Sequence, residues 1–370
     1  MTKKPNNHVV FVGGGSAGHV LPALPVADLL IARGAKVTFI GTRSGLEEGY
    51  VQGRDVEFIG ISAGKLRRYF DWQNISDLGR IVLALFQALG IFMRLRPAVL
   101  VSKGGFVSVP PVVAARLLSI PVLAHESDLT PGLANRLSLP FIRTLCTSFA
   151  DTKVSGFRGR LVCTGTPIRT ALLQGQAQVG AERFGLPNKK PVLLVTGGSL
   201  GAESLNTRIR AALPQLTERF YVVHVCGVGK MAPLASPDYQ QLEFVDEGWG
   251  DLLAAADLVV SRAGANALFE LIALKKLNLL IPLPAAASRG DQIENAGYAQ
   301  RRGFSVVLDE AQATPEALVA ALDTLLAETS QYRQALNAEA VGDAGAALLA
   351  ELLDLAGDRL ALAEREIEPS

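Results

Sequence analysis

The sequence predicts an α/β protein with two doubly wound, Rossmann-like parallel-sheet domains in tandem. Short apolar runs alternate with longer helical segments, a pattern typical of a parallel sheet that helices cover on both faces. A strand followed by a glycine turn opens the chain at residues 9–18, and the same order restarts at residues 192–201. The chain has 370 residues, which suits two domains of about 150–200 residues each.

The elements follow from these apolar runs. In the first domain a helix is expected at 21–33 and strands at 9–12, 36–40, 57–61, 98–102, 121–124, 144–147 and 160–163. In the second domain helices are expected at 315–327 and 343–356, and strands from 192 and at 221–226, 243–245, 258–261, 279–282 and 305–308. We therefore divide the chain into an N-terminal domain (1–167), a second domain (168–342) and a C-terminal segment (343–370). Its helix is expected to pack back on the N-terminal domain, and its charged tail to fray.

Bulk composition narrows the class of protein. Hydrophobic residues make up 49% and charged residues 19% of the chain, so large cores are expected and disorder is not. A formal net charge of +1 gives no overall attraction to nucleic acid. Cys146, Cys163 and Cys226 are far apart in sequence, which suits a reducing cytoplasm and predicts no metal cluster. We expect no signal peptide, and no apolar run reaches the roughly 20 residues that span a bilayer.

The first glycine turn carries the pattern G-x-G-x-x-G at Gly13, Gly15 and Gly18. By itself this pattern favours a nicotinamide or flavin site. A dinucleotide fold, however, places an acid at the end of its second strand to bind the ribose, and Glu47 comes too late for that role. His19 stands where the helix is expected to open, and its titratable ring indicates chemistry as well as binding at this turn.

Glycine turns recur along the chain. One follows the strand at 98–102, at Gly104 and Gly105, and another follows the strand that begins at 192. Glycine lets the backbone turn sharply and approach a ligand closely. Three such turns after strands are much more specific than one, and they favour a protein that binds phosphorylated ligands.

Two neighbouring segments raise the question of a membrane surface. Residues 65–72 interleave basic residues with Tyr69, Phe70 and Trp72, a composition suited to anionic headgroups; a solvated loop is the alternative. Residues 81–93 are nearly all apolar, but about thirteen residues are too few to span a bilayer. We expect most of this second segment to be an ordinary buried helix.

A series of motifs occurs in the order found in one enzyme family. The motifs are Gly14-Gly15-Ser16-Ala17-Gly18-His19, Gly104-Gly105-Phe106-Val107-Ser108, His125-Glu126, Gly165-Thr166-Pro167-Ile168-Arg169, Gly197-Gly198-Ser199-Leu200-Gly201-Ala202 and Ser261-Arg262-Ala263-Gly264-Ala265 through Glu270. This series resembles the MurG family of peptidoglycan N-acetylglucosaminyltransferases. The likeness runs from about residue 8 to about residue 350, and residues 125–132 look most like the Gram-positive branch.

The resemblance implies a GT-B transferase, in which two Rossmann-like domains face each other across a cleft. The implied donor is UDP-N-acetylglucosamine, and the implied acceptor is lipid I, undecaprenyl-pyrophosphoryl-N-acetylmuramoyl pentapeptide. Transfer inverts the anomeric carbon and gives lipid II for cell-wall synthesis, with no cofactor and no metal. The resemblance also implies peripheral attachment to an anionic membrane surface on the cytoplasmic face of the cell membrane, with other cell-wall synthesis proteins as partners and no nucleic acid.

The resemblance also assigns residues to the two substrates. The acceptor is expected at Gly14, Gly15, Gly104 and Gly105. For the donor, the helix expected to open at 199–201 suits the pyrophosphate, Arg169 the leaving group and Glu270 the ribose hydroxyls, while the backbone of Val245 at a strand end meets the uracil. The full donor set is Ser16, Ala17, Gly18, Asp128, Arg169, Ser199, Leu200, Gly201, Val245, Ala265, Asn266, Ala267, Leu268, Phe269, Glu270 and Gln292.

Some positions depart from one common version of the family pattern. Asp128 stands where an asparagine often stands, and Asp291-Gln292 replaces a pair of glutamines. A carboxylate accepts from sugar hydroxyls but cannot donate to them. Ser16-Ala17 replaces Thr-Gly, and alanine tolerates a positive φ poorly.

A base must take the proton from the acceptor hydroxyl. An unperturbed histidine titrates near neutrality, so His19 is the first candidate; binding a phosphate or capping the turn is its alternative role. Glu126 and Asp128 are rival bases. Three other functions stay open: another inverting GT-B enzyme with a lipid acceptor, a nicotinamide oxidoreductase, and a non-catalytic protein that binds nucleotide sugars. Turnover of UDP-N-acetylglucosamine with a lipid I analogue separates the first interpretation from all of them.

Overall fold

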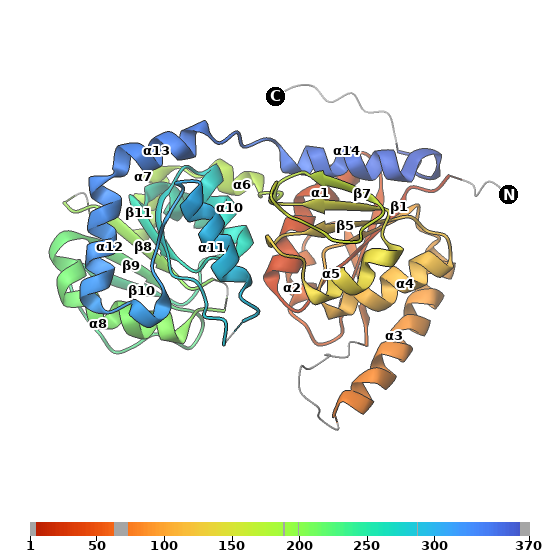
Figure 1. The fold of residues 1–370 in the computed structure, drawn as a ribbon, viewed down its shortest axis with the longest axis horizontal. Helices are drawn as coiled ribbons and strands as arrows, with labels where there is room; N and C mark the ends of the chain where they lie inside the picture. Colours follow the sequence, from red (N-terminus) through yellow and green to blue (C-terminus); the bar gives the residue numbers. More distant parts are fainter. Residues whose placement is uncertain (1–4, 63–72, 188, 199, 287, 363–370) are drawn as a thin grey trace. The chain divides into compact units, whose positions relative to one another are not determined.

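The computed structural model describes residues 5–62, 73–187, 189–198, 200–286 and 288–362 (Figure 1). The chain divides into two compact units. Met1–Pro167 and Gly342–Ser370 form the first unit, and Ile168–Val341 forms the second. Each unit is built on a parallel sheet of its own, so the predicted α/β class with two doubly wound domains is confirmed.

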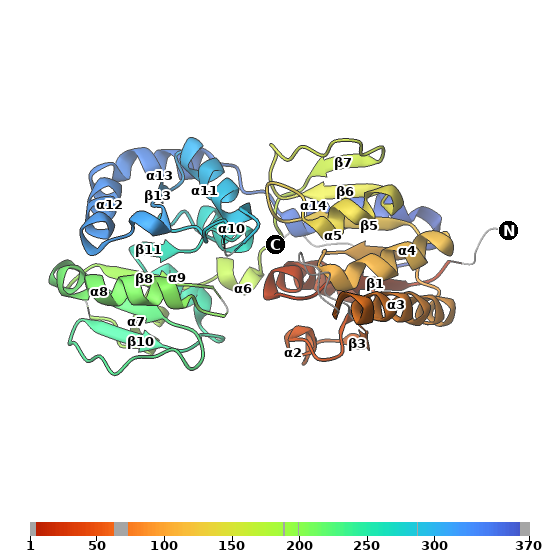
Figure 2. The ribbon, with the colours of Figure 1, turned by 60° about the horizontal axis from the view of Figure 1, so that its bottom comes forward.

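The first unit contains a seven-stranded sheet in the order β3-β2-β1-β4-β5-β6-β7, with β3 and β7 at its edges (Figure 2). Its strands are β1 His8–Val12, β2 Lys36–Thr42, β3 Val56–Ile61, β4 Val99–Ser102, β5 Val122–Glu126, β6 Thr144–Thr147 and β7 Arg160–Cys163. The order reverses between β1 and β4. In open parallel sheets, ligands bind beyond the carboxyl ends of the strands at such a point.

Helices cover both faces of this sheet. Alternate residues of β1 point to opposite faces: Val9 and Phe11 pack with α1 and α14, whereas Val10 and Val12 pack with α3 and α4. The α-helices are α1 Leu24–Ala32, α2 Glu47–Val51, α3 Gln73–Leu95, α4 Val109–Leu117, α5 Leu133–Ser138 and α14 Ala344–Ala356. Short 3₁₀ helices are η1 Ala17–His19, η2 Leu21–Ala23, η3 Phe106–Ser108, η4 Leu139–Phe141 and η6 Gly357–Arg359.

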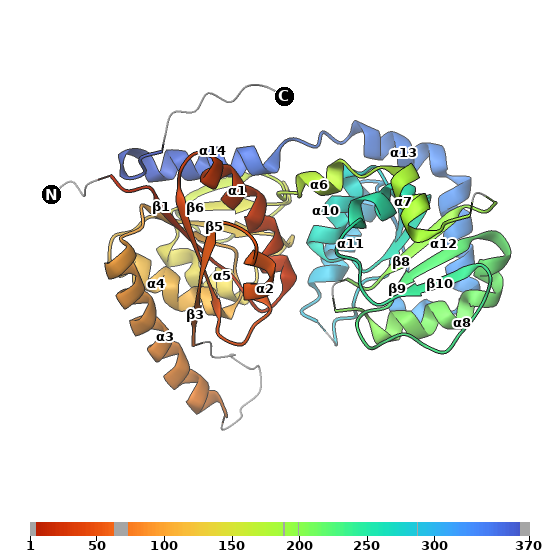
Figure 3. The ribbon, with the colours of Figure 1, turned by 180° about the vertical axis from the view of Figure 1, so that it is seen from behind.

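The helix α14 follows the whole second unit in sequence but packs in the first. It lies beside α1 (Figure 3), and its buried Leu348 and Leu352 join the same core as Phe11 of β1. The Asp343 side chain caps its start by accepting a hydrogen bond from the Ala346 N–H at 2.9 Å. One face of the first sheet is therefore completed by a helix that follows the second unit in sequence.

The second unit contains a six-stranded parallel sheet in the order β10-β9-β8-β11-β12-β13. Its strands are β8 Val192–Thr196, β9 Tyr221–Val225, β10 Tyr239–Leu242, β11 Leu258–Ser261, β12 Leu277–Leu280 and β13 Val306–Val307. Apolar residues of α8 and α12 bury one face of this sheet. The helices are α6 Thr170–Leu173, α7 Ala177–Phe184, α8 Glu203–Arg219, α9 Trp249–Ala255, α10 Ala265–Ala273, α11 Asp291–Arg301, α12 Pro315–Ala327, α13 Thr329–Ala338 and the 3₁₀ helix η5 Glu310–Gln312.

The strand expected at 243–245 is wrong. β10 ends at Leu242, and Val245 lies in the loop after it. The partner strand β9 ends at Val225 and the chain then turns at Gly227, whose φ is +98°. Glu243 is hydrogen-bonded to this turn: its carbonyl accepts a hydrogen bond from the Gly227 N–H, and its side chain accepts one from the Gly229 N–H. It therefore does not extend strand β10.

The helix expected at 21–33 is present in two parts, the 3₁₀ helix η2 at Leu21–Ala23 and α1 from Leu24, where Pro25 takes a position in the first turn that suits proline. His19 ends the separate 3₁₀ helix η1 before them. In the second unit the helix opens later than the sequence predicts: α8 begins at Glu203, so Leu200 and Gly201 belong to the turn before the helix.

The apolar segment at 81–93 is only partly a buried helix. Within α3, Ala84, Ala88 and Phe92 are buried against the sheet, but four large apolar side chains of the same segment are exposed: Val82, Leu83, Phe86 and Met93. Since the segment is apolar nearly all round, a single sheet face covers only one of its stripes. The basic and aromatic segment at 65–72 lies outside the described residues.

Candidate active site

In the first unit, three loops meet at the carboxyl ends of β1, β4 and β5. A Cβ on Gly105 would lie 2.1 Å from the Gly14 carbonyl oxygen, so the glycine turns after β1 and β4 are in direct contact. A Cβ on Gly104 would lie 3.5 Å from both His19 Cδ2 and the Asn135 amide nitrogen. The structure thus brings the predicted acceptor glycines and the predicted base together at the topological switch point of the sheet.

Within the turn after β1, Ser16 is hydrogen-bonded to His19. Ser16 Oγ lies 3.0 Å from His19 Nδ1, and the Ser16 carbonyl accepts from the His19 N–H at 3.1 Å. Gly15 has a φ of +87°, whereas Ala17 is not among the described residues with positive φ. Alanine in place of glycine at position 17 therefore brings no backbone strain to this turn.

Glu126 holds the loop that follows β5. It is 5% exposed, its Oε1 accepts from the Asp128 N–H at 3.0 Å, and its Oε2 accepts from the Gly132 N–H and the Asn135 amide at 2.9 and 2.8 Å. A carboxylate engaged by three donors is a better anchor than a proton acceptor. This geometry favours His19 over Glu126 as the base.

A buried lysine and a buried histidine lie in contact beneath these loops. Lys103 and His125 are 1% and 0% exposed; Lys103 Nζ donates to His125 Nδ1 at 2.5 Å, and His125 Nε2 donates to the Gly165 carbonyl at 2.9 Å. Burial lowers the pKa of Lys103 to about 7 and lowers the pKa of His125 well below its ordinary value. The pair ties β4 and β5 to the segment at Gly165, where the first unit ends.

In the second unit, the glycine turn after β8 carries a cation that the sequence interpretation missed. Lys230 Nζ donates to the Leu200 carbonyl at 2.8 Å and to the Gly201 carbonyl at 3.2 Å. Gly201 has a φ of +65°, and a Cβ there would lie 2.0 Å from the Cys226 carbonyl. Ser199 lies outside the described residues. The signal for Lys230 was available: it follows β9, whose carboxyl end lies beside that of β8 at the same sheet edge.

The predicted sugar contacts at 265–269, with the predicted ribose ligand Glu270 after them, form the first turns of α10. Gly264 caps this helix, and the first intrahelical bond runs from the Leu268 N–H to the Gly264 carbonyl. Ala265 and Leu268 are buried, whereas Asn266, Ala267 and Phe269 are partly exposed. The Leu268 side chain therefore packs inside the unit, and the positive end of the helix dipole faces the carboxyl edge of the sheet.

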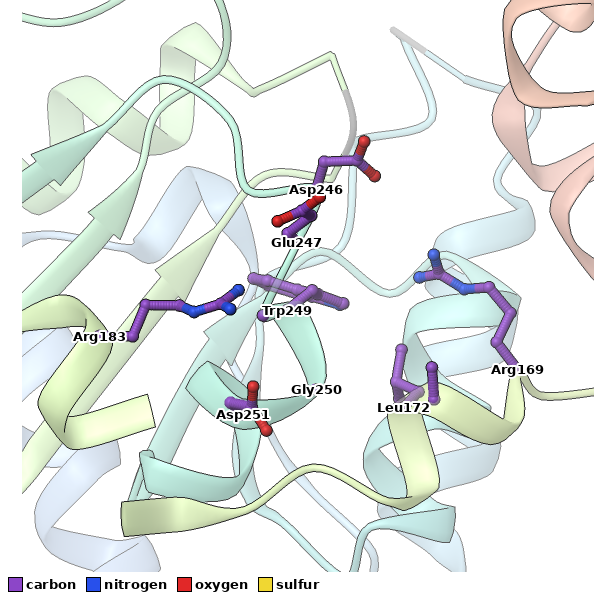
Figure 4. Close-up of a pocket in the computed structure, with 10 residues that line it drawn as sticks. Arg169, Leu172, Arg183, Asp246, Glu247, Trp249, Gly250 and Asp251 are labelled. Carbon is purple, nitrogen blue, oxygen red and sulfur yellow. The ribbon is translucent and has the colours of Figure 1, made fainter. Parts of the chain in front are cut away.

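Glu270 lies near a cation and an indole. Burial raises the pKa of the Glu270 carboxyl, while the Arg169 guanidinium and a hydrogen bond from Trp249 act in the opposite direction. Arg169 and Trp249 both line a pocket of about 360 Å³, and Figure 4 shows Arg169 and Arg183 on opposite sides of the Trp249 ring. The other residues that line the pocket are Ala171, Leu172, Asp246, Glu247, Gly248, Gly250 and Asp251.

Gln292 lies in the first turn of α11. Its Oε1 accepts a hydrogen bond from the Leu283 N–H at 3.0 Å, so its amide NH₂ is the group that can donate to a ligand. The neighbouring Asp291 forms an ion pair with Arg289 at 3.1 Å. Val245 lies next to Asp246 at the pocket rim, in a loop whose backbone is not part of the sheet ladder.

Comparison with protein families matches both halves of the chain. The model described as glycosyltransferase family 28 N-terminal domain matches residues 9–146, and the C-terminal domain model of that family matches residues 192–353. The chain belongs to glycosyltransferase family 28. The predicted transferase class is thereby confirmed.

Individual relatives show which members of glycosyltransferase family 28 this chain is similar to. It is 45% identical over 338 residues (91% of this chain, 96% of the relative) to a Clostridium kluyveri UDP-N-acetylglucosamine–N-acetylmuramyl-(pentapeptide) pyrophosphoryl-undecaprenol N-acetylglucosamine transferase. It is 44% identical over 349 residues (93% and 96%) to a protein of the same name from Legionella pneumophila. Since the two identities are nearly equal, the Gram-positive branch stays a prediction.

A solved structure supports the same placement. The crystal structure of Acinetobacter baumannii MurG matches with a TM-score of 0.74 and 27% identity, covering 95% of this chain and 100% of that chain. The resemblance to the MurG family and the GT-B class of fold are both confirmed by these matches. The residue assignments inferred from the resemblance stay predictions.

Proposed function

We propose that this chain transfers N-acetylglucosamine from UDP-N-acetylglucosamine to undecaprenyl-pyrophosphoryl-N-acetylmuramoyl pentapeptide, giving lipid II. The observation that carries the proposal is the 45% identity, over 91% of the chain, to a relative named for this reaction. In the reaction, the acceptor hydroxyl oxygen bonds to the anomeric carbon from the face opposite the phosphate. The bond from that carbon to the phosphate oxygen breaks, UDP leaves, and the hydroxyl proton passes to a base.

The second unit is proposed to hold the donor. Glu270 accepts from the two ribose hydroxyls, and the Val245 backbone meets the uracil beside the pocket that Trp249 lines. Arg169 and Lys230 supply positive charge to the pyrophosphate near the turn that contains Leu200 and Gly201. Fixed cations stabilise the charge that develops on UDP as it leaves.

The donor sugar is assigned to the start of α10 and to Gln292. Amide groups at a helix N-terminus favour oxygen acceptors, and the Gln292 NH₂ donates where a carboxylate cannot. Further donor contacts from the first unit are proposed at Ser16, Ala17, Gly18 and Asp128.

The first unit is proposed to bind the acceptor and supply the base. Gly14, Gly104 and Gly105 shape a surface that brings backbone close to the ligand, and His19 stands in the same cluster. His19 is assigned as the base because an imidazole nitrogen can accept a proton and because donors already engage Glu126.

Contact with a membrane is proposed through α3. Its exposed Val82, Leu83, Phe86 and Met93 form an apolar stripe, and Arg80 and Arg94 flank it. An apolar stripe with flanking cations suits an anionic lipid surface, where it inserts among headgroups without crossing the bilayer. Among the residues that the structure describes, no helix has the length and apolar character of a membrane span. The proposed location is the cytoplasmic face of the cell membrane.

Turnover tests the proposal directly. Purified chain is incubated with labelled UDP-N-acetylglucosamine and a soluble lipid I analogue, and the disaccharide product and UDP are quantified together. Equal amounts of both products are expected, and the new glycosidic bond should have the inverted configuration. Release of UDP without the disaccharide, or transfer only to an unrelated glycolipid, would contradict the assigned acceptor.

A further inference from the structure

The first glycine turn is built around a carboxylate that the sequence patterns do not explain. Glu47 begins α2 and is 2% exposed. Its Oε1 accepts a hydrogen bond from the Gly15 N–H at 2.8 Å, and its Oε2 accepts one from the Thr42 hydroxyl at 2.9 Å. The carboxylate therefore connects the turn after β1 with the end of the neighbouring strand β2.

Glycines leave the space that this carboxylate fills. A Cβ on Gly14 would lie 2.4 Å from Glu47 Oε1, and a Cβ on Gly45 would lie 1.6 Å from Glu47 Oε2. On Gly41, a Cβ would lie 3.0 Å from the Glu47 Cβ. No side chain fits at Gly14 or Gly45 unless the carboxylate moves. A Cβ on Gly14 would also lie 2.9 Å from Val107 Cγ1, so packing within the protein accounts for the glycine there without a phosphate.

Charge distinguishes this turn from the one in the second unit. A buried carboxylate repels a pyrophosphate and occupies an N–H that an anion would need. At the turn after β8, by contrast, the Lys230 ammonium is bonded to the Leu200 and Gly201 carbonyls. Of these two turns, the turn after β8 is the one whose backbone carbonyls bind a cation.

We infer that Glu47 is a positioning residue for the proposed transfer reaction, and that the Gly15 N–H does not bind the acceptor pyrophosphate. Glu47 fixes Gly15 in its left-handed conformation. Gly15 leads directly into Ser16, which is bonded to His19 through both its hydroxyl and its carbonyl. Glu47 thereby sets the place of the proposed base from beneath the turn. The inference rests on the proposed function.

Three variants test the role in turnover. Glu47→Ala removes both acceptors, whereas Glu47→Gln keeps one oxygen for the Gly15 N–H. Glu48→Ala is the matched control, because Glu48 is the exposed next residue of the same helix. We expect Glu47→Ala to lower kcat with the lipid I analogue about 10²-fold, as for a misplaced catalytic group. The Kd for UDP, measured by calorimetry, should stay unchanged because the second unit holds the donor.

The conservative variant separates positioning from charge. Glu47→Gln and Glu48→Ala should both keep a kcat close to that of the wild-type chain. Normal kcat in Glu47→Ala would overturn the inference, and so would an equally large loss in Glu47→Gln. If Glu47→Ala does not fold, Glu47→Asp takes its place: its shorter side chain cannot reach both donors, and the same loss is expected.

Hydrogen exchange gives a readout that does not depend on activity. Exchange is followed by mass spectrometry on a peptide that contains residues 13–20. We expect the Gly15 amide to be protected in the wild-type chain and in Glu47→Gln, and to exchange rapidly in Glu47→Ala. Unchanged exchange in Glu47→Ala would overturn the inference even in an active enzyme. A wild-type chain that transfers no sugar would instead reject the proposed function, so the two failures are distinguishable.

Discussion

Ser16 Oγ lies 3.0 Å from His19 Nδ1, in the turn that leads from β1 to α1. Histidine has two ring nitrogens, and the hydrogen bond at one of them decides the role of the other. When Nδ1–H donates to the serine oxygen, Nε2 is the basic nitrogen. Ser16 is therefore placed to orient the ring of the proposed base, in addition to any contact with the donor.

Replacing the proposed base should lower kcat without weakening the binding of the donor. We expect His19→Ala to reduce kcat with the lipid I analogue about 10²–10⁴-fold, the range typical of a lost general base. Ser16→Ala should reduce it less, because the ring remains and loses only its orienting bond. The UDP-N-acetylglucosamine Kd is measured by calorimetry in parallel. Near-normal kcat in His19→Ala would move the base to Asp128 or Glu126, and loss of donor binding would mean that His19 binds the donor instead of acting as the base.

UDP, but not NAD, should raise the melting temperature of the chain. At a UDP concentration of 100 times Kd the gain in stability is about 2.7 kcal/mol. Glu270→Ala should weaken UDP binding because a ribose contact is lost in ground state and transition state alike. Glu294→Ala, on an exposed position of α11, is the control. A shift with NAD and none with UDP would contradict the transferase assignment.

UDP affinity should fall at mildly acid pH. Burial raises the pKa of Glu270, so this carboxyl takes up a proton at a higher pH than an ordinary glutamate. Only the ionised form accepts from both ribose hydroxyls, so affinity is full above the raised pKa and is lost as the pH drops through it. Calorimetric titrations across this range in wild-type chain and Glu270→Gln test the assignment. The same acid loss in Glu270→Gln would mean that another group titrates.

Donor binding should not need a divalent metal, because protein cations carry the charge of the pyrophosphate. We expect turnover to persist in excess chelator and Lys230→Ala to raise the KM for UDP-N-acetylglucosamine. Lys189→Ala, an exposed lysine of the second unit, serves as the control. Activity that disappears in chelator and returns with magnesium would refute this account of the leaving group.

The apolar stripe of α3 should govern binding to lipid. Vesicles that contain anionic lipid are sedimented with wild-type chain and with Phe86→Ser, whose native side chain is 65% exposed. The bound fraction should fall in the variant, whereas kcat with a soluble acceptor should not change. Met231→Ser removes an equally apolar exposed side chain of the second unit and should have no effect. Equal binding by both variants would exclude α3 as the lipid contact.

The sequence by itself determined the two-sheet architecture and the family. Strand periodicity, the glycine turns after β1, β4 and β8, and the ordered motifs are local patterns that a single chain displays without its neighbours. Boundaries were harder to predict. Residues 243–245 have strand character, but their pairing depends on whether β9 continues beside them, and β9 ends at Val225.

Only the tertiary structure decided which side chains meet. Glu47 lies too far along the chain to resemble a ribose-binding acid, yet the return of the chain after β2 places it on the Gly15 N–H. Lys230 follows β9 but binds the turn after β8, because the two strands are neighbours in the sheet. Phe86 lies in an apolar segment whose sequence predicts a buried helix. It is exposed because one sheet face covers only one stripe of a helix. Such contacts join residues that are distant in sequence. Local sequence patterns do not predict them, because the fold alone determines the distance between the two side chains.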